Sequence, residues 1–193
     1  MTLGAIRRAK YSQAALRESH MSLDLNIRRL RPGDTAALVS LRREALENHP
    51  LAFGASIGDD RGLSAEFVRT ALADDQEQAV FGQFEGTSLT GMVGVMREPK
   101  VKRRHRALIW GMYVAPHARE RGVGRGLLEA AIAHARAWPG VDQVHLSVTD
   151  TAVPARKLYE AAGFRSWGRE PLALSWEGRF VDELHFVLDL GKK

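Results

Sequence analysis

The chain has 193 residues, of which 45% are hydrophobic and 26% are charged, and these proportions are typical of a globular protein with one sizeable core. It contains no cysteine, which excludes disulfides and thiolate catalysis, and no apolar run reaches the 18 residues that a membrane helix needs. The formal net charge of +5 is carried by residues 1–31, so the rest is balanced and nucleic-acid binding is not expected. Because the chain has no cysteine and no apolar run long enough for a membrane helix, a cytoplasmic location is the simplest interpretation.

Residues 1–21 are basic, and their only acidic side chain is Glu18. They lack the apolar core of a secretory signal. Linkers and internal repeats are not evident in the remainder. We therefore predict a basic N-terminal extension at 1–21, followed by a single domain at 22–193.

The first half of that domain alternates between strand and helix patterns. A short strand is predicted over 26–30, and Asp34 is a suitable N-cap for a helix whose apolar residues recur on one face. A second helix is predicted over 64–73. Two alternating segments, 78–85 and 89–96, then predict an antiparallel hairpin.

The second half is arranged around an apolar segment, 107–114, which we predict to be a strand buried on both faces. A glycine-rich turn follows it and opens into a helix over 124–137. A strand is predicted over 144–148 and a helix from Pro154 to Gly163, where glycine suits the position after a helix end. The last predicted elements are the strands of a closing hairpin, 171–176 and 180–190.

The glycine-rich turn is a candidate anion site. Gly122, Gly124 and Gly126 allow a tight backbone turn and a close approach to a ligand, and the first NH groups of the helix have no intrahelical partner. Free donors at the positive end of a helix dipole bind phosphate. The dinucleotide pattern GxGxxG fails at Leu127, and the Gly-Lys-Ser/Thr of a Walker loop is missing.

The pattern that fits is Arg119-x-x-Gly122-x-Gly124, directly after a strand that ends at Val114. It resembles the acetyl-CoA signature of the GCN5-related N-acetyltransferases. Residues 155–164, ARKLYEAAGF, resemble the second motif of that family. The resemblance implies an α/β fold with a mixed, mostly antiparallel sheet of about seven strands flanked by about four helices. It also implies transfer of an acetyl group from acetyl-CoA to an amine acceptor by direct attack in a ternary complex.

The same resemblance assigns candidate roles to individual residues. Tyr159 matches the acid that protonates the departing thiolate, and Gly111 within the strand indicates a bulge beside the cofactor. Backbone NH groups of the central strand are candidates for supporting the oxyanion, and those of the loop for binding the pyrophosphate. The expected cofactor-binding residues are Met112, Tyr113, Val114, Arg119, Glu120, Arg121, Gly122, Val123, Gly124, Arg125 and Gly126.

A general base is harder to identify. A lysine amine with a pKa of about 10.4 is only roughly one part in a thousand neutral near pH 7, so a base or an amine of low pKa is expected. Asp182 shares a face with the apolar residues of the last strand, so we expect its carboxylate to point inward as the catalytic base. Glu183, His145 and Asp150 are the alternatives. No histidine spacing suits a metal, so none is expected.

Four questions stay open at this stage. The acceptor is a small-molecule amine or the amine of a protein or peptide, and Phe53 is a candidate contact for it by resemblance. Relatives often carry Asn where this chain has Ala152, which leaves a non-catalytic acyl-CoA-binding module as an alternative function. The basic segment 97–106 is expected to be a solvated turn between strands, with contact to an acidic substrate or to the 3′-phosphate of CoA as the alternative. Together with the basic N-terminal residues, this segment also leaves nucleic-acid binding as a weaker interpretation. Exposed sheet edges also suggest a homodimer.

Overall fold

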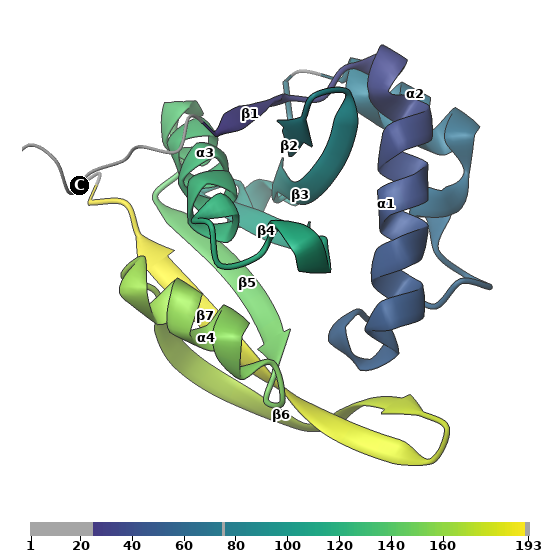
Figure 1. Cartoon of the computed structure of the whole chain (residues 1–193). Coiled ribbons are helices and arrows are strands. Elements are labelled where there is room, and N and C mark those ends of the chain that lie inside the picture. Colours follow the sequence, from purple (N-terminus) through teal and green to yellow (C-terminus); the bar gives the residue numbers. More distant parts are fainter. Residues whose placement is uncertain (1–24, 75, 192–193) are drawn as a thin grey trace, which may run out of the picture.

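The computed structural model describes residues 25–74 and 76–191, so the predicted extension at 1–21 lies outside the described residues (Figure 1). Seven strands form one sheet, and four α-helices cover it. The strands are β1 (Asn26–Arg29), β2 (Gln78–Glu85), β3 (Ser88–Arg97), β4 (Arg106–Val114), β5 (Gln143–Thr149), β6 (Arg165–Trp176) and β7 (Arg179–Asp189). The helices are α1 (Thr35–Asn48), α2 (Ala65–Ala73), α3 (Val123–Ala137) and α4 (Val153–Ala161). The predicted fold class is confirmed.

The strand order β1-β2-β3-β4-β5-β7-β6 contains one parallel pair, β4 with β5, among antiparallel neighbours. That pair is short, because only Arg106–Leu108 of β4 faces Gln143–His145 of β5. Beyond Leu108 the two strands diverge, as Figure 1 shows. The sheet is therefore split at its centre, at the carboxyl ends of both strands.

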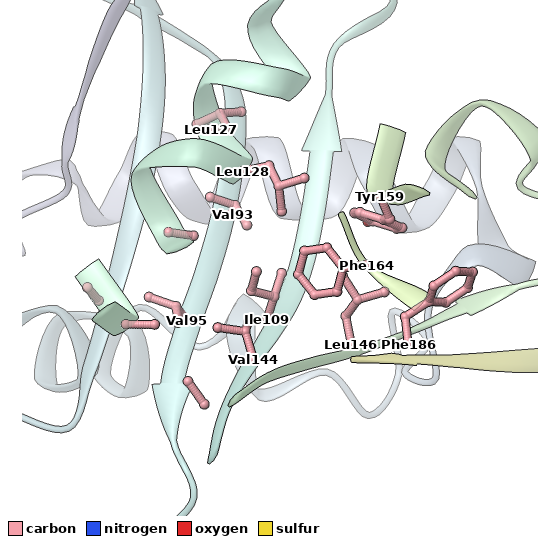
Figure 2. Close-up of a cluster of buried hydrophobic side chains, with 14 of the residues drawn as sticks. Val93, Val95, Ile109, Leu127, Leu128, Val144, Leu146, Tyr159, Phe164 and Phe186 are labelled. Carbon is pink, nitrogen blue, oxygen red and sulfur yellow. The ribbon is translucent and has the colours of Figure 1, made fainter. Parts of the chain in front are cut away.

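Two apolar cores fill the two faces of the sheet. One core lies under α1 and α2 and includes Leu38, Leu41 and Met92. The other lies under α3 and α4, where Figure 2 shows Leu127, Leu128 and Tyr159 gathered with side chains of the sheet. Among the described residues, no helix has the length and hydrophobicity to cross a membrane.

Strand β4 is not buried on both faces, so that part of the prediction is wrong. Ala107 and Ile109 pack under α3, but Trp110 on the opposite face is 41% exposed. The reason is that α1 and α2 pack mainly over β2 and β3, and they leave the middle of β4 beside a cavity. A continuous apolar run identifies a strand but does not tell whether a helix covers both faces.

The bulge predicted at Gly111 is confirmed. Gly111 has a φ of +62°, and the pairing with β3 shifts between Met92 and Gly94, so two residues of β4 oppose one of β3. After the bulge, Met112 packs towards the α3 side and Tyr113 towards the α1 side. The bulge therefore inverts which residues face which core, and it turns Met112 towards the split in the sheet.

Strand β6 begins at Arg165, six residues before the predicted start at Pro171. Here the pairing with β7 is interrupted between Glu170 and Leu174, so Pro171 lies in a bulge of a strand at the edge of the sheet. An edge strand tolerates proline because one side of its backbone has no partner strand.

Gly94 of β3 lies directly under the ring of Trp110, and a Cβ atom there would lie 2.1 Å from Trp110 Cε2. We expect Gly94→Ala to lower the free energy of unfolding by about 1–3 kcal/mol, because the ring has to leave its place. Gly33→Ala is the matched control, since a Cβ at Gly33 meets nothing within 4 Å. Urea denaturation of both variants measures the difference, and equal stability would show that the indole moves away freely.

Candidate active site

The divergence of β4 and β5 leaves a cleft of about 100 Å³ at the centre of the molecule. Strand β4 contributes residues on both sides of the bulge, β5 contributes Leu146 to Val148, and α4 contributes Tyr159. The complete lining consists of Ala52, Phe53, Ile109, Trp110, Gly111, Met112, Leu146, Ser147, Val148, Ala152, Ala155 and Tyr159. The family-derived candidates Phe53, Met112 and Tyr159 are thus brought together in one cleft.

Tyr159 is the most buried polar side chain of this cleft, with 6% of its surface exposed. Burial raises the pKa of its phenol to about 12. Its hydroxyl lies 3.5 Å from Met112 Sδ, which is a weak acceptor. The phenol is therefore protonated at any ordinary pH, and its proton has no strong partner in the cleft.

The backbone of β4 is also exposed to the cleft. Because the ladder with β5 ends at Leu108, the peptide groups of β4 that point towards β5 after this residue have no partner strand. An extended ligand with amide groups is able to pair with such an edge, as peptides do when they add a strand to a sheet.

The glycine-rich turn lies at the start of α3. Glu120 and Gly122 both have positive φ, +62° and +77°, and together they reverse the chain so that α3 begins at Val123. Gly126 N donates to Gly122 O at 3.0 Å, which is the first helical bond of that end. The NH groups of Val123, Gly124 and Arg125 precede it and have no intrahelical acceptor, which is the arrangement that the predicted anion site requires.

The arginine side chains around this turn form hydrogen bonds and ion pairs with other residues of the protein. Arg119 donates from Nε to Val114 O at 2.9 Å and from Nη2 to His49 Nε2 at 2.9 Å, while Arg121 pairs with Glu85 at 2.6 Å. Arg125 pairs with Glu129 one helical turn on, at 2.7 Å. In this structure Arg119 fixes the turn to the end of β4, so the candidate anion site consists of backbone NH groups.

Gly124 connects the turn with the cleft. A Cβ at this position would lie 3.3 Å from Leu158 Cδ2, 3.7 Å from Met112 Cε and 4.0 Å from Val114 Cγ2. Met112 also lines the cleft, so the anion site and the cleft are contiguous. Tyr113 differs, since its side chain lies in the other core and donates to Glu44 Oε1 at 2.9 Å, and burial raises the pKa of its phenol. Only its backbone is oriented for a role in the cleft.

Asp182 does not extend into the core as the alternation of β7 suggested. Its carboxylate accepts hydrogen bonds from Leu172 N at 2.7 Å and from Arg169 Nε at 2.5 Å. These two hydrogen bonds hold the pKa of Asp182 below its usual range, and the bond from Leu172 N has the larger effect. The physical reason is the bulge of β6, which turns a backbone NH towards Asp182. A carboxylate with two donors and a low pKa is a weak base, so the structure does not support that role.

The three alternative bases differ in their relation to the cleft. Asp150 Oδ2 accepts from Arg169 at 3.2 Å. His145 Nε2 lies 3.1 Å from Gln143, and burial lowers the pKa of its imidazole, with the charge of Arg106 as a second cause. Glu183 alone of these accepts a bond from a residue that lines the cleft, Ser147, whose Oγ donates at 3.0 Å.

A second cavity, of about 360 Å³, lies on the α1 and α2 face of the sheet. It shares Trp110 and Gly111 with the cleft, so the two spaces meet at the bulge of β4. Arg42 of α1 and Asp60 line it as a buried ion pair with side chains 12% and 6% exposed. Sequence reasoning missed both residues. The available signal was an arginine four residues after Leu38, on the apolar face of its helix.

Metal ligands do not gather in this region. Within residues 25–74 and 76–191, histidine, aspartate and glutamate side chains form no group of three or more with the arrangement of a metal site.

Comparison with known proteins agrees with this geometry. The sequence model of the acetyltransferase (GNAT) family matches residues 38–164. A mycothiol acetyltransferase from Propionibacterium freudenreichii is 27% identical over 150 residues, which are 76% of this chain and 45% of that protein. The chain therefore spans less than half the length of this curated relative.

Two solved structures show the same architecture. A GNAT-family acetyltransferase from Streptococcus pneumoniae matches with a TM-score of 0.76 and 26% identity, over 86% of this chain and 100% of that one. NAA60 from Arabidopsis thaliana, solved in complex with acetyl-CoA, matches with a TM-score of 0.68 and 18% identity, over 87% of this chain and 99% of that one. The glycine-rich turn, the bulged strand and the split sheet thus occur in a chain that belongs to the acetyltransferase (GNAT) family, a family of acyltransferases.

Proposed function

We propose that this protein transfers the acetyl group of acetyl-CoA to an amine acceptor. The observation that carries the proposal is the continuity of the anion site with the cleft at Gly124. A ligand with a diphosphate at one end and an extended amide chain at the other matches this shape. The similarity to a mycothiol acetyltransferase and to a fold solved with acetyl-CoA supports the same ligand.

The residues present fit acetyl-CoA. The NH groups of Val123, Gly124 and Arg125 would hold the pyrophosphate, together with the helix dipole. The backbone of Met112, Tyr113 and Val114, which has no partner strand on the β5 side, would bind the amide chain and support the developing oxyanion. When bound, acetyl-CoA supplies an acetyl group already activated as a thioester.

Tyr159 would supply the proton for the leaving thiolate. Its pKa of about 12 keeps the proton on the phenol until a strong base forms next to it. A thiolate released into the same buried cleft would have its own pKa raised by desolvation from an ordinary value of about 8.5, which would reduce the difference from the pKa of the phenol. The amine attacks from the other side of the sheet, where the second cavity opens at Trp110 and Gly111.

Release of free thiol tests the proposal. The purified protein is mixed with acetyl-CoA and a panel of primary amines, and thiol is followed with a chromogenic reagent. Amine-dependent thiol release supports the transferase. Thermal stabilisation by acetyl-CoA without thiol release from any amine would favour the alternative, a non-catalytic acyl-CoA-binding module.

The pH dependence of the reaction checks the assignment of Tyr159. For an acceptor with an α-amine, kcat/KM is expected to rise as pH increases through about 8, because the neutral amine is the nucleophile. No decline is expected up to about pH 10, because the raised pKa of Tyr159, about 12, leaves the acid protonated throughout. Initial rates between pH 6 and 10 measure the profile. A fall in kcat/KM near pH 9 would show that a group other than Tyr159 supplies the proton to the leaving thiolate.

A further inference from the structure

In the ion pair of the second cavity, Arg42 bonds to Asp60 through two of its three guanidinium nitrogens. Both Nε and Nη2 of Arg42 donate to Asp60 Oδ2, at 3.0 and 2.5 Å. The other oxygen of Asp60 accepts from Gly62 N at 2.5 Å. The guanidinium is therefore fixed in orientation, with Asp60 held in turn by the backbone.

The remaining nitrogen, Arg42 Nη1, is buried and has no hydrogen-bond partner among the described residues. A buried donor without an acceptor is costly, so an acceptor from a ligand is the expected partner. The position of Nη1 is informative, because it lies 3.9 Å from the place of a Cβ on Gly111. The guanidinium carbon also lies 4.5 Å from the ring centre of Phe53, which lines the cleft. Nη1 thus lies near the bulge, where the cleft and the second cavity meet.

The charge of this cavity favours a neutral oxygen over a carboxylate. Its charged side chains are Arg42, Arg61, Asp59 and Asp60, which balance. Arg42 is already neutralised by Asp60, and an added carboxylate would lie close to that aspartate. A carbonyl oxygen accepts from Nη1 without adding charge.

The rest of the cavity is apolar. Its wall is formed by aliphatic and aromatic side chains of α1, α2 and the sheet, among them Leu38, Phe67, Val68, Leu72, Val80 and Met92. Such a wall binds a hydrocarbon side chain of the acceptor.

We propose that the acceptor is an α-amino amide with an apolar side chain, either a free amino-acid amide or the first residue of a peptide. The side chain fills the second cavity, the carbonyl oxygen accepts from Arg42 Nη1, and the α-amine faces the cleft at Gly111. This proposal rests on the acetyl transfer proposed above. It also accounts for the lack of a well-placed base, because an α-amine has a pKa near 8 and is substantially neutral close to pH 7.5.

The test compares three acceptors that share the leucine side chain and differ in the group on the α-carbon: leucinamide has an amide, leucine a carboxylate and 3-methylbutan-1-amine only hydrogen. The tripeptide Leu-Gly-Gly represents a peptide N-terminus. Values of kcat/KM are expressed per neutral amine, which removes the difference in amine pKa. We expect leucinamide to exceed 3-methylbutan-1-amine by about ten- to a hundredfold, the worth of a hydrogen bond from a charged donor. Comparison of leucinamide with Leu-Gly-Gly then distinguishes the free amide from the peptide terminus.

Arg42→Lys is the decisive variant, because it keeps a cation for Asp60 but removes the planar group that carries Nη1. In this variant, kcat/KM for leucinamide is expected to exceed kcat/KM for 3-methylbutan-1-amine by no more than about threefold. Arg43→Lys, one residue along on the exposed side of α1, is the control and should keep the wild-type preference.

The outcomes separate the two proposals. An unchanged preference in Arg42→Lys, a tenfold preference for leucine over leucinamide, or thiol release only with amines outside this panel would overturn the α-amino amide and leave acetyl transfer intact. The absence of any thermal stabilisation by acetyl-CoA would overturn both. Thermal stabilisation of Arg42→Lys by acetyl-CoA, measured in parallel, shows that the variant is folded and still binds the cofactor.

Discussion

Replacing Tyr159 with phenylalanine is expected to lower kcat by about 10²–10⁴, the usual range for loss of a positioned acid. The phenol lies in the cleft with a pKa of about 12, and its hydroxyl has only a weak contact with Met112 Sδ at 3.5 Å. Removing the hydroxyl therefore leaves the packing of the ring unchanged, while the leaving thiolate loses its proton donor. Steady-state thiol release measures the effect.

The fold and cofactor affinity of Tyr159→Phe should be preserved, which thermal unfolding with acetyl-CoA verifies. Thr90→Val is a matched control, because it removes another buried hydroxyl, one that donates to Gln83 O at 3.4 Å on β2. We expect Thr90→Val to keep the wild-type kcat. A Tyr159→Phe variant with more than a third of wild-type kcat would remove Tyr159 from the reaction.

Replacing Gly124 with glutamate is expected to abolish acetyl-CoA binding while the fold remains. Gly124 lies at the junction of the anion site and the cleft, where a Cβ would already be 3.3 Å from Leu158 Cδ2. A carboxylate placed there would occupy the ligand path and repel the diphosphate. Acetyl-CoA at a hundred times its dissociation constant stabilises the native state by about 2.7 kcal/mol, and this stabilisation should disappear in the variant.

Two further variants separate the effect of side-chain size at position 124 from the effect of an added negative charge. Gly124→Ala adds only a methyl group against a flexible leucine end and should keep most of the affinity. Ala161→Glu adds the same charge at an exposed position of α4 and should bind acetyl-CoA like the wild type. Retained acetyl-CoA affinity in a folded Gly124→Glu variant would refute the location of the diphosphate.

The features that the sequence predicted correctly depend on local backbone chemistry. The bulge at Gly111 and the turn at Gly122 both need positive φ, and glycine at those positions is visible without any tertiary information. The two family motifs also named Met112 and Tyr159, which the fold brings together in one cleft.

The features that the sequence did not predict depend on contacts between distant segments. The environment of Asp182 is set by a bulge in the neighbouring strand β6, where Leu172 has a φ of +53° and donates its NH to Asp182. The unused donor of Arg42 exists because Asp60, eighteen residues away, occupies the other nitrogens. Alternation and spacing describe which face a residue is on, but they do not describe its partner.

Thermal unfolding with acetyl-CoA, with NAD and without ligand tests the central claim most directly. At a hundred times the dissociation constant, stabilisation of about 2.7 kcal/mol corresponds to a rise of about 5–11 °C in Tm for a chain of this size. We predict that rise with acetyl-CoA and no change with NAD. An unchanged Tm at saturating acetyl-CoA would contradict the assignment of the glycine-rich turn and the cleft to this cofactor.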